Sequence, residues 1–280
     1  MAFDREGLEE WLAALTTRGV YLGASSWKFP GWLGTVYEEE RYLQNGMFSQ
    51  ALFERECLRE YAEIFPTVRL DKMDRKYPSS AYLRDLVSQV PEDFLFTLRV
   101  CDDITVKRFS GGSKSGPGAG QPNFNFLDAD LFVTKFLAPC YEIQPNVGLI
   151  LFDFSRVRAS DFKSDKEFLH QLLHFVAELP RDWDYGIEMA DPDLISSHYF
   201  LILDNYSITH VFSERTGLPH AIELFEVPMA RTNPVLLTSH LVVDTRVEYR
   251  DAAKEFAPFD KLRAPNPHAR EAASAMVEET

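Results

Sequence analysis

The sequence predicts an α/β fold, a TIM-like (β/α) barrel that has seven strands or is imperfect. Strand and helix signals alternate along the chain, which implies right-handed βαβ units and a parallel sheet. Seven strands are convincing and the helix after the sixth is poorly defined, so a full eight-stranded barrel stays open. The absence of a Gly-x-Gly-x-x-Gly turn places a doubly wound open sheet second. Residues 56–65 are expected to form a helix that Pro66 ends. After residue 66 the signals cover 67–71, 81–89, 94–100, 130–141, 146–152, 166–179, 184–188, 194–204, 209–213 and 234–243.

The length and hydrophobic content predict a single structural domain. The chain has 280 residues, of which 45% are hydrophobic, enough for a sizeable core, and no linker divides it. Residues 1–18 are expected to form a helix packed on the barrel, because apolar residues recur at helical spacing between residues 8 and 15. Residues 19–246 would form the barrel, and 247–280 a C-terminal extension.

The net charge and the lengths of the apolar runs argue against nucleic acids and membranes as partners. A formal net charge of -14, from 43 acidic and 29 basic residues, disfavours the attraction to phosphate backbones on which nucleic-acid binding depends. The chain begins with no basic-then-apolar leader, and no apolar run reaches the roughly 18 residues that a membrane span needs. We therefore expect a cytoplasmic protein that contacts no membrane, with an undetermined oligomeric state.

Cysteine and histidine spacing indicates no metal site. Cys57, Cys101 and Cys140 are widely separated and odd in number, so buried free thiols are the expected state. His170 and His174 lie four residues apart, but the stretch lacks the glutamate of a zinc protease motif, and metal binding there is disfavoured. No organic cofactor motif is present, and the cofactor, if one is used, is not predicted.

A short stretch with two tryptophans follows the first predicted strand, residues 20–25. Trp27 and Trp32 stand in a Pro/Gly loop directly after that strand. Large aromatic side chains are costly to leave in water, so they are expected either to cover the core or to line a pocket at the strand end. Covering the core is the favoured interpretation, because buried aromatics usually belong to the core.

This stretch also carries a family resemblance. Gly23-Ala24-Ser25-Ser26-Trp27, with Trp32 and Tyr37, resembles the opening motif of the domain of unknown function number seventy-two family, the YecE-like proteins. The resemblance continues through 148–155, 185–188 and 256–267, about residues 20 to 270 in all. It implies a TIM-type barrel, and it implies no reaction, because no biochemical activity is established for the family.

Strand alternation predicts which charged side chains point into the barrel. On each strand the side that meets the helices must be apolar, so the other side points inward. On the third strand Phe96 and Leu98 would face the helices, which turns Arg99 inward. The same reasoning applied to the neighbouring strands, with the fourth strand ambiguous, gives a ring that consists of Arg69, Asp71, Arg99, Asp153 and Glu188.

Two interpretations of this ring stay open. One is a buried ion network that only fills the barrel. The other is an enzyme site at the carboxyl ends of the strands, where the active sites of such barrels lie. In the second interpretation the candidate catalytic residues are Glu188, Asp71 and Asp153, and the candidate ligand-binding residues are Ser25, Trp27, Arg69, Arg99 and His240.

The expected activity is acid/base chemistry on a small, polar, anionic metabolite. Basic residues near the ends of the second and third strands would attract such an anion or would simply be solvated. They are Arg69, Lys72, Arg75, Lys76, Lys107, Arg108 and Lys114. The glycine-rich stretch 107–125 would form a flap over the barrel mouth or an unstructured insertion. The alternative function is a non-catalytic ligand-binding or protein-interaction member of the family, and a nucleic-acid-processing barrel comes third.

Departures from the family pattern favour that alternative. Relatives often carry Glu-x-Asn on the second strand, where this chain has Arg69-Leu70-Asp71, and a lysine on the third, where it has Arg99. The arginine usually found two residues after Glu188 is Ala190. Because arginine stays protonated, Arg99 cannot act as a base or form a Schiff base as a lysine can. If the family catalyses a reaction through these residues, the departures imply that the reaction is altered or lost in this chain.

Overall fold

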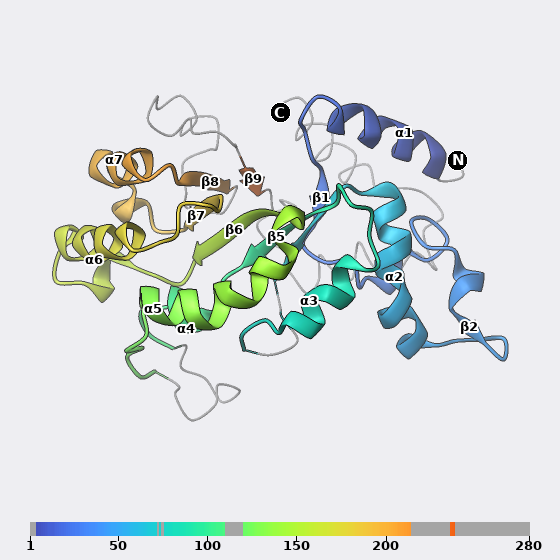
Figure 1. The fold of residues 1–280 in the computed structure, drawn as a ribbon, viewed down its shortest axis with the longest axis horizontal. Helices are drawn as coiled ribbons and strands as arrows, with labels where there is room; N and C mark the ends of the chain where they lie inside the picture. The colour runs from blue at the N-terminus through green and yellow to red at the C-terminus, as the bar shows by residue number, and fades with distance from the viewer. Residues whose placement is uncertain (1–3, 72, 74–75, 110–119, 214–235, 239–280) are drawn as a thin grey trace, which may run out of the picture. The chain divides into compact units, whose positions relative to one another are not determined.

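The structure is a computed structural model that describes residues 4–71, 73, 76–109, 120–213 and 236–238. These residues form an α/β fold whose parallel strands alternate with helices (Figure 1). They divide into two compact units. Of the described residues, the first unit holds 4–71 and 81–97, and the second holds 73, 76–80, 98–109, 120–213 and 236–238. The predicted C-terminal extension and residues 239–246 lie outside the described residues.

The first unit is built on capped helices and a short parallel pair of strands. Asp4 caps α1 by accepting a hydrogen bond from the Gly7 N–H, and Ser49 caps α2 in the same way. Strands β1 and β4 are parallel, and the order in this unit is β1-β4-β5. The elements are α1 (Arg5–Thr16), β1 (Gly23–Ala24), η1 (Pro30–Trp32), η2 (Glu39–Tyr42), β2 (Leu43–Gln44), β3 (Met47–Phe48), α2 (Gln50–Ile64), β4 (Thr67–Leu70), α3 (Ser80–Val87) without its first residue, and the first three residues of β5 (Leu95–Arg99).

The helix expected within residues 1–18 is present as α1, Arg5–Thr16, and two other predicted boundaries in this unit are wrong. Helix α2 begins at Gln50, six residues before the predicted start, because the Ser49 cap and buried Phe53 extend its apolar face towards the N-terminus. Strand β1 covers only residues 23–24 of the predicted 20–25. Trp32 lies in a 3-10 turn (η1, Pro30–Trp32) and stacks on Tyr61, so the aromatic loop adds to the core of this unit.

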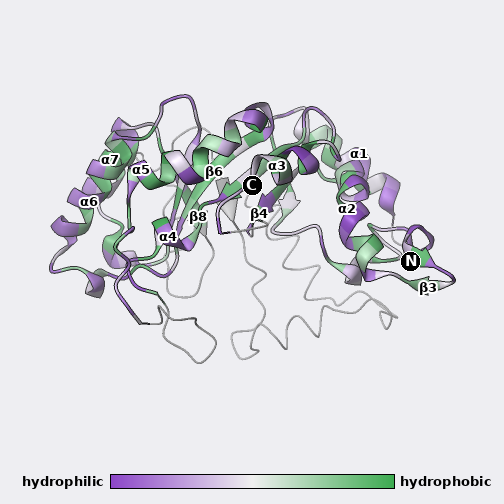
Figure 2. Ribbon diagram, turned by 60° about the horizontal axis from the view of Figure 1, so that its bottom comes forward, coloured by the Kyte–Doolittle hydropathy of each residue, from purple (hydrophilic) through white to green (hydrophobic). Residues whose placement is uncertain are grey.

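The second unit contains the longest strands. Its strand order is β5-β6-β7-β8-β9, and the printed pairs β6–β7, β7–β8 and β8–β9 are all parallel. In Figure 2 the ribbon of β6 is largely green, whereas helix α6 carries both colours, as expected for a buried strand and an amphipathic helix. The strands are β6 (Val147–Phe154), β7 (Tyr185–Met189), β8 (Thr209–Ser213) and β9 (Leu236–Thr238), with the last two residues of β5.

The helices of the second unit cover the apolar side of these strands. Helices α6 and α7 lie next to each other beside β7 and β8 (Figure 1). The predicted helix 130–141 is longer and irregular: it runs through a π-helical turn (η3, Phe132–Leu137) into a 3-10 segment (η4, Ala138–Asn146). The other helical segments are α4 (Asp102–Thr105), α5 (Ala129–Leu131), η5 (Ala159–Asp161), α6 (Asp165–Ala177), η6 (Pro192–Leu194) and α7 (Ser197–Asn205).

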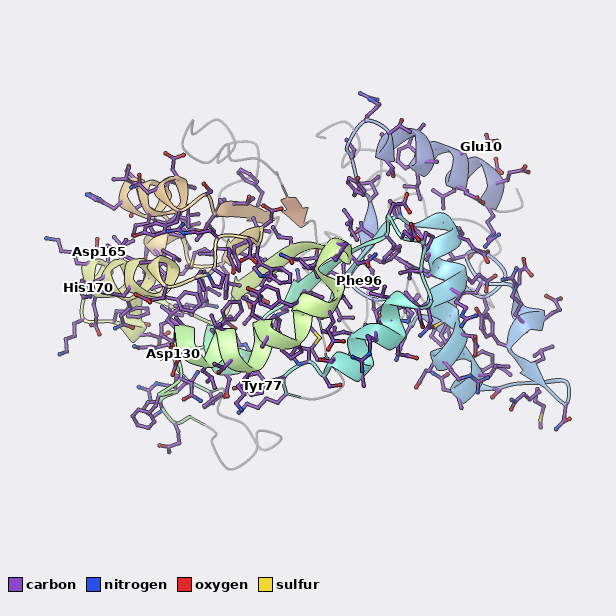
Figure 3. The ribbon with its side chains drawn as sticks, in the orientation of Figure 1. Glu10, Tyr77, Phe96, Asp130, Asp165 and His170 are labelled. Atoms are coloured by element: carbon purple, nitrogen blue, oxygen red, sulfur yellow. The ribbon has the colours of Figure 1, made fainter. Side chains whose placement is uncertain are left out.

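The burial pattern agrees with the alternation expected for the strands. Phe96 and Leu98 of β5 are fully buried, while Thr97 and Arg99 between and beyond them are half-buried. Figure 3 labels Phe96 on this strand. The described base of the 107–125 stretch is closed by an antiparallel bridge between Arg108 and Pro122. Among the described residues, no helix has both the length and the apolar character that crossing a membrane requires.

Candidate functional site

Arg99 and Asp153 form the centre of a charged cluster in the second unit. Arg99 is the last residue of β5, and its Nε donates a hydrogen bond of 2.8 Å to Asp153 Oδ2. Asp153 is only 5% exposed, and its Oδ1 accepts a 2.8 Å bond from the Ser155 N–H. Burial acts to raise the pKa of Asp153, but the Arg99 charge and the bond from Ser155 outweigh it, so the pKa falls to about 2. Asp153 is therefore an anion at neutral pH.

Glu188 lies beside Asp153 on the neighbouring strand. The two residues are register partners in the parallel β6–β7 pair, so both side chains are on the same face of the sheet. Neighbouring strands are about 4.8 Å apart, and Glu188 has no exposed surface. The structure therefore places two buried carboxyl groups side by side near the carboxyl ends of β6 and β7.

Two charged residues that the sequence analysis did not select complete the cluster. Arg99 Nη2 lies 3.2 Å from Asp102 Oδ1, and the same oxygen forms an ion pair with Arg156. Both residues directly follow strands, Asp102 three residues after the end of β5 and Arg156 two residues after the end of β6. That position at the carboxyl ends of parallel strands is the signal that could have found them.

The cluster constrains what Arg99 can do. Burial acts to lower its pKa, but Asp153 and Asp102 outweigh burial and raise it, so Arg99 remains a cation. Its Nε and Nη2 are engaged by carboxylates, and only Nη1 makes no hydrogen bond within the described part of the chain. A ligand can therefore accept hydrogen bonds from Nη1 of Arg99, but not from the whole guanidinium.

The other predicted site residues lie in the first unit. Arg69 Nε donates a 2.6 Å bond to Asp71 Oδ1, which makes a local pair two residues apart on one strand end. Trp27 is 5% exposed, and its carbonyl accepts a hydrogen bond from the Tyr37 hydroxyl. Ser25 is exposed and directly follows β1. Packing in the core accounts for the burial of Trp27 as well as a ligand-binding role would. His240 lies outside the described residues.

Two of the predicted basic residues are held by the protein itself. Lys76 Nζ lies 2.6 Å from Asp103 Oδ2, which also accepts a 2.6 Å bond from the Tyr77 hydroxyl. Figure 3 labels Tyr77 in this unit. Lys107 Nζ donates a 2.9 Å bond to Gln171 Oε1 and lies 5.0 Å from the centre of the Phe126 ring. Lys76 and Lys107 therefore tie loops to the unit, while the predicted Lys72, Arg75 and Lys114 lie outside the described residues.

His210 is a buried titratable group that the sequence analysis did not select. It lies on β8 beside Ile187 of β7, and its Nδ1 is 3.0 Å from the Tyr199 hydroxyl of α7. Burial lowers the pKa of His210 to about 4, and the charge of Glu188 acts in the opposite direction. The ring packs edge-on against Phe200 and Phe212, so His210 belongs to the helix-facing core.

The described residues offer few metal ligands. Among them, no group of three or more His, Cys, Asp and Glu side chains could hold a metal ion. His170, labelled on α6 in Figure 3, and His174 are paired through their Nε2 atoms at 3.1 Å. Cys57, Cys101 and Cys140 are free thiols, with Cys57 and Cys140 buried as predicted. Burial raises the pKa of the Cys140 thiol to about 12, so it is not a reactive thiolate.

Comparison with known proteins decides the family. The model of a family described as "Protein of unknown function DUF72" matches residues 21–273. The chain belongs to the DUF72 family. The name YecE-like fits this family, and the resemblance of the opening motif is confirmed. No curated protein matches the chain.

Solved structures of other DUF72 proteins resemble parts of this chain. Two structures of one protein from Enterococcus faecalis V583 match at a TM-score of 0.44. The first is 20% identical over 58% of this chain and 55% of that one, and the second is 16% identical over 71% and 78%. A DUF72 protein from Thermotoga maritima MSB8 is 19% identical over 71% of this chain and 66% of its own, also at 0.44. None of these names carries an activity, so the chemistry rests on the geometry of the site.

Proposed function

We propose that this DUF72 protein is an enzyme that uses acid/base chemistry on a small, polar, anionic metabolite. The observation that carries the proposal is the pair of buried carboxylates, Asp153 and Glu188, in register on neighbouring strands with Arg99 beside them. We further propose that the strands belong to a TIM-like barrel that has seven strands or is imperfect, and that the protein works in the cytoplasm. Family membership and the strand–helix alternation support the barrel.

The two carboxylates would have different tasks. Asp153 stays ionised, because Arg99 and the Ser155 N–H both stabilise its charge, and it holds the guanidinium in place. Glu188 moves the proton to or from the substrate. Arg99 Nη1 contacts an anionic group of the substrate. The place of these residues at the carboxyl ends of parallel strands supports the assignment, because barrel enzymes bind their substrates there.

The first experiment is a thermal-shift screen of the wild type and Glu188→Gln against organic acids and phosphorylated sugars. A ligand at about 100 times its Kd adds roughly 2.7 kcal/mol to the free energy of unfolding. For a substrate found in this way, we expect Glu188→Gln to lower kcat about 100-fold or more while KM changes little. Asp130→Asn, which changes an exposed carboxylate labelled in Figure 3, is the matched control. Turnover by Glu188→Gln at the wild-type rate would remove the proposed role.

A non-catalytic binding protein is the second candidate. The observation in its favour is that carboxylates already bind Nε and Nη2 of Arg99, at the position where relatives often have a lysine. Saturable binding of a ligand with equal affinity in the wild type and Glu188→Gln, and without turnover in either, would favour this candidate.

A further inference from the structure

Two histidines on one face of α6 bring their ring nitrogens together. His170 and His174 are four residues apart, so their side chains are neighbours on the helix surface. The centres of the two rings are 4.4 Å apart, and the two Nε2 atoms are 3.1 Å apart. Both residues are exposed, and Figure 3 labels His170 on this helix. An ion in solution can therefore reach both nitrogens.

The separation of these nitrogens is the one expected for two ligands of a single metal ion. Imidazole nitrogens bind zinc at about 2.0–2.1 Å. For an angle at the metal between about 90°, as in square-planar coordination, and about 109°, as in tetrahedral coordination, the two nitrogens lie about 2.9–3.4 Å apart. The observed 3.1 Å falls within this range. The spacing on α6 therefore suits the binding of one ion by both rings.

A hydrogen bond between the two neutral rings gives the same distance and is the competing explanation. In water such an exposed bond contributes little, because each ring can bond to water instead. The glutamate that a zinc protease motif has, and this stretch lacks, is a general base and not a metal ligand. Its absence excludes the protease reaction but does not bear on metal binding.

A surface groove beside the pair leaves room for further ligands of the metal. The volume of the groove is about 370 Å³, and both histidines line it together with Phe126, Leu127 and Glu178. No three His, Cys, Asp or Glu side chains in the described part of the chain could hold a metal ion together, so the protein supplies two ligands here. Water or a small molecule in the groove can take the remaining coordination positions. Positions left open in this way are typical of metals that bind a further ligand rather than of structural metals.

The charges around the pair are balanced and do not exclude a cation. Glu167 lies three residues before His170 on α6, and the exposed Glu178 lies four residues after His174. The positive charges are Lys166 and Lys107, and Lys107 Nζ is bound to Gln171 Oε1. A metal ion between the two rings therefore meets no net positive charge from its neighbours.

The ligand type indicates the class of metal. Imidazole suits Zn²⁺, Cu²⁺ and Ni²⁺, whereas Mg²⁺ and Ca²⁺ prefer oxygen ligands. For the same nitrogen ligands Cu²⁺ binds more tightly than Ni²⁺ or Zn²⁺. We propose that His170 and His174 bind one divalent transition-metal ion through their Nε2 atoms, and that water or a small molecule in the groove completes its coordination.

The metal site is separate from the charged cluster and does not rest on the proposed function. Phe152 of β6 packs against Phe175 of α6. Phe154 of the same strand packs against Phe168 of that helix. Asp153 lies between these two strand residues, so its side chain points to the opposite face of the sheet, away from α6.

The test is isothermal titration calorimetry of the full chain, freed of metal with a chelator, with Cu²⁺, Zn²⁺ and Mg²⁺ in turn. We expect Cu²⁺ to bind more tightly than Zn²⁺, and Mg²⁺ not to bind. The Kd for Zn²⁺ should rise at least about 10-fold in His170→Gln and in His174→Gln, because one ring alone loses the gain from binding with both. The double variant should bind no more weakly than either single variant. His198→Gln, at an exposed position on α7, is the matched control and should keep the wild-type Kd, as should Glu188→Gln.

The comparison of single and double variants separates binding by both rings from adventitious binding. A Kd for Zn²⁺ that is unchanged in the double variant would show an adventitious ion at other residues and would overturn the site. Costs that add from the single variants to the double variant would show two independent one-histidine sites, and would also overturn it. So would the absence of Zn²⁺ and Cu²⁺ binding to the wild type, which would leave the hydrogen bond as the explanation of the 3.1 Å distance. Both substitutions are at exposed positions, and circular dichroism checks that each variant is folded.

Discussion

His210 links the stability of the protein to pH through a single buried side chain. The ring is 2% exposed, and its pKa falls to about 4 from an ordinary value near 6.5. Protonation of His210 therefore favours the unfolded chain. Its contribution is constant above pH 6.5, and stability is lost as the pH falls from 6.5 towards 4. Asp153 does not contribute in this window, because its pKa of about 2 and its ordinary value both lie lower.

We expect the free energy of unfolding to fall by about 2 kcal/mol between pH 7 and pH 5 because of His210. The measurement is urea unfolding at both pH values for the wild type and for His210→Gln, which keeps a polar group beside the Tyr199 hydroxyl. The variant should be less stable at pH 7 but should lose clearly less stability on acidification. His198→Gln, at an exposed position on α7, is the control and should keep the wild-type slope. Equal slopes in wild type and His210→Gln would show that His210 titrates normally.

At the scale of the element, strand β7 depends on a glycine for its packing. A Cβ at Gly186 would lie 2.8 Å from Leu149 Cδ2 and 2.9 Å from Val211 Cγ2, on the strands either side. Leu149, Leu151 and Val211 form a buried apolar cluster there. The side chains of Leu149 and Val211 therefore leave no room for a side chain at position 186. The same face of the sheet carries Asp153 and Glu188.

Gly186→Ala should destabilise the protein by about 1–3 kcal/mol, the usual range for overpacking a core. Shortening the neighbour should relieve the clash, so Gly186→Ala combined with Leu149→Ala should cost less than the sum of the two single changes. Chemical unfolding of the three variants and the wild type measures this coupling. Additive costs would mean that the backbone moves to admit the methyl group, and that the close approach does not control the packing of β7.

The strands and their faces could be predicted because alternation has a strict period of two. Phe96 and Leu98 of β5 are buried where the pattern placed them. Boundaries that depend on caps or on irregular turns could not be predicted as well. Helix α2 follows the Ser49 cap rather than beginning at residue 56, and the segment from Phe132 to Asn146 departs from α-helical geometry.

At the scale of the whole molecule, the candidate site was only partly predictable. Sequence patterns selected the charged residues on the strands, and the structure brings Arg99, Asp153 and Glu188 together in the second unit. Asp102 and Arg156 were not predicted as site residues, because they lie beyond the strand ends, where alternation no longer assigns a side chain to a face. The partners of Arg69 and Lys76 could not be predicted either, since ion pairs in loops depend on backbone paths that the sequence does not state.

The net charge of the chain leads to a prediction about nucleic acids. With 43 acidic and 29 basic residues the molecule repels a polyanion, and Lys76 and Lys107 already interact with Asp103 and Gln171 of the protein itself. Non-specific binding to nucleic acid depends on releasing counterions from phosphates, which needs a basic surface, and typically gives Kd values of about 10⁻⁴ to 10⁻⁶ M. We therefore expect no change in the fluorescence anisotropy of labelled duplex DNA or single-stranded RNA at about 0.15 M salt, with protein up to about 10 µM. Binding that appears at low salt and weakens steeply as salt is added would instead reveal a local basic surface, and would restore a nucleic-acid-processing role for this fold.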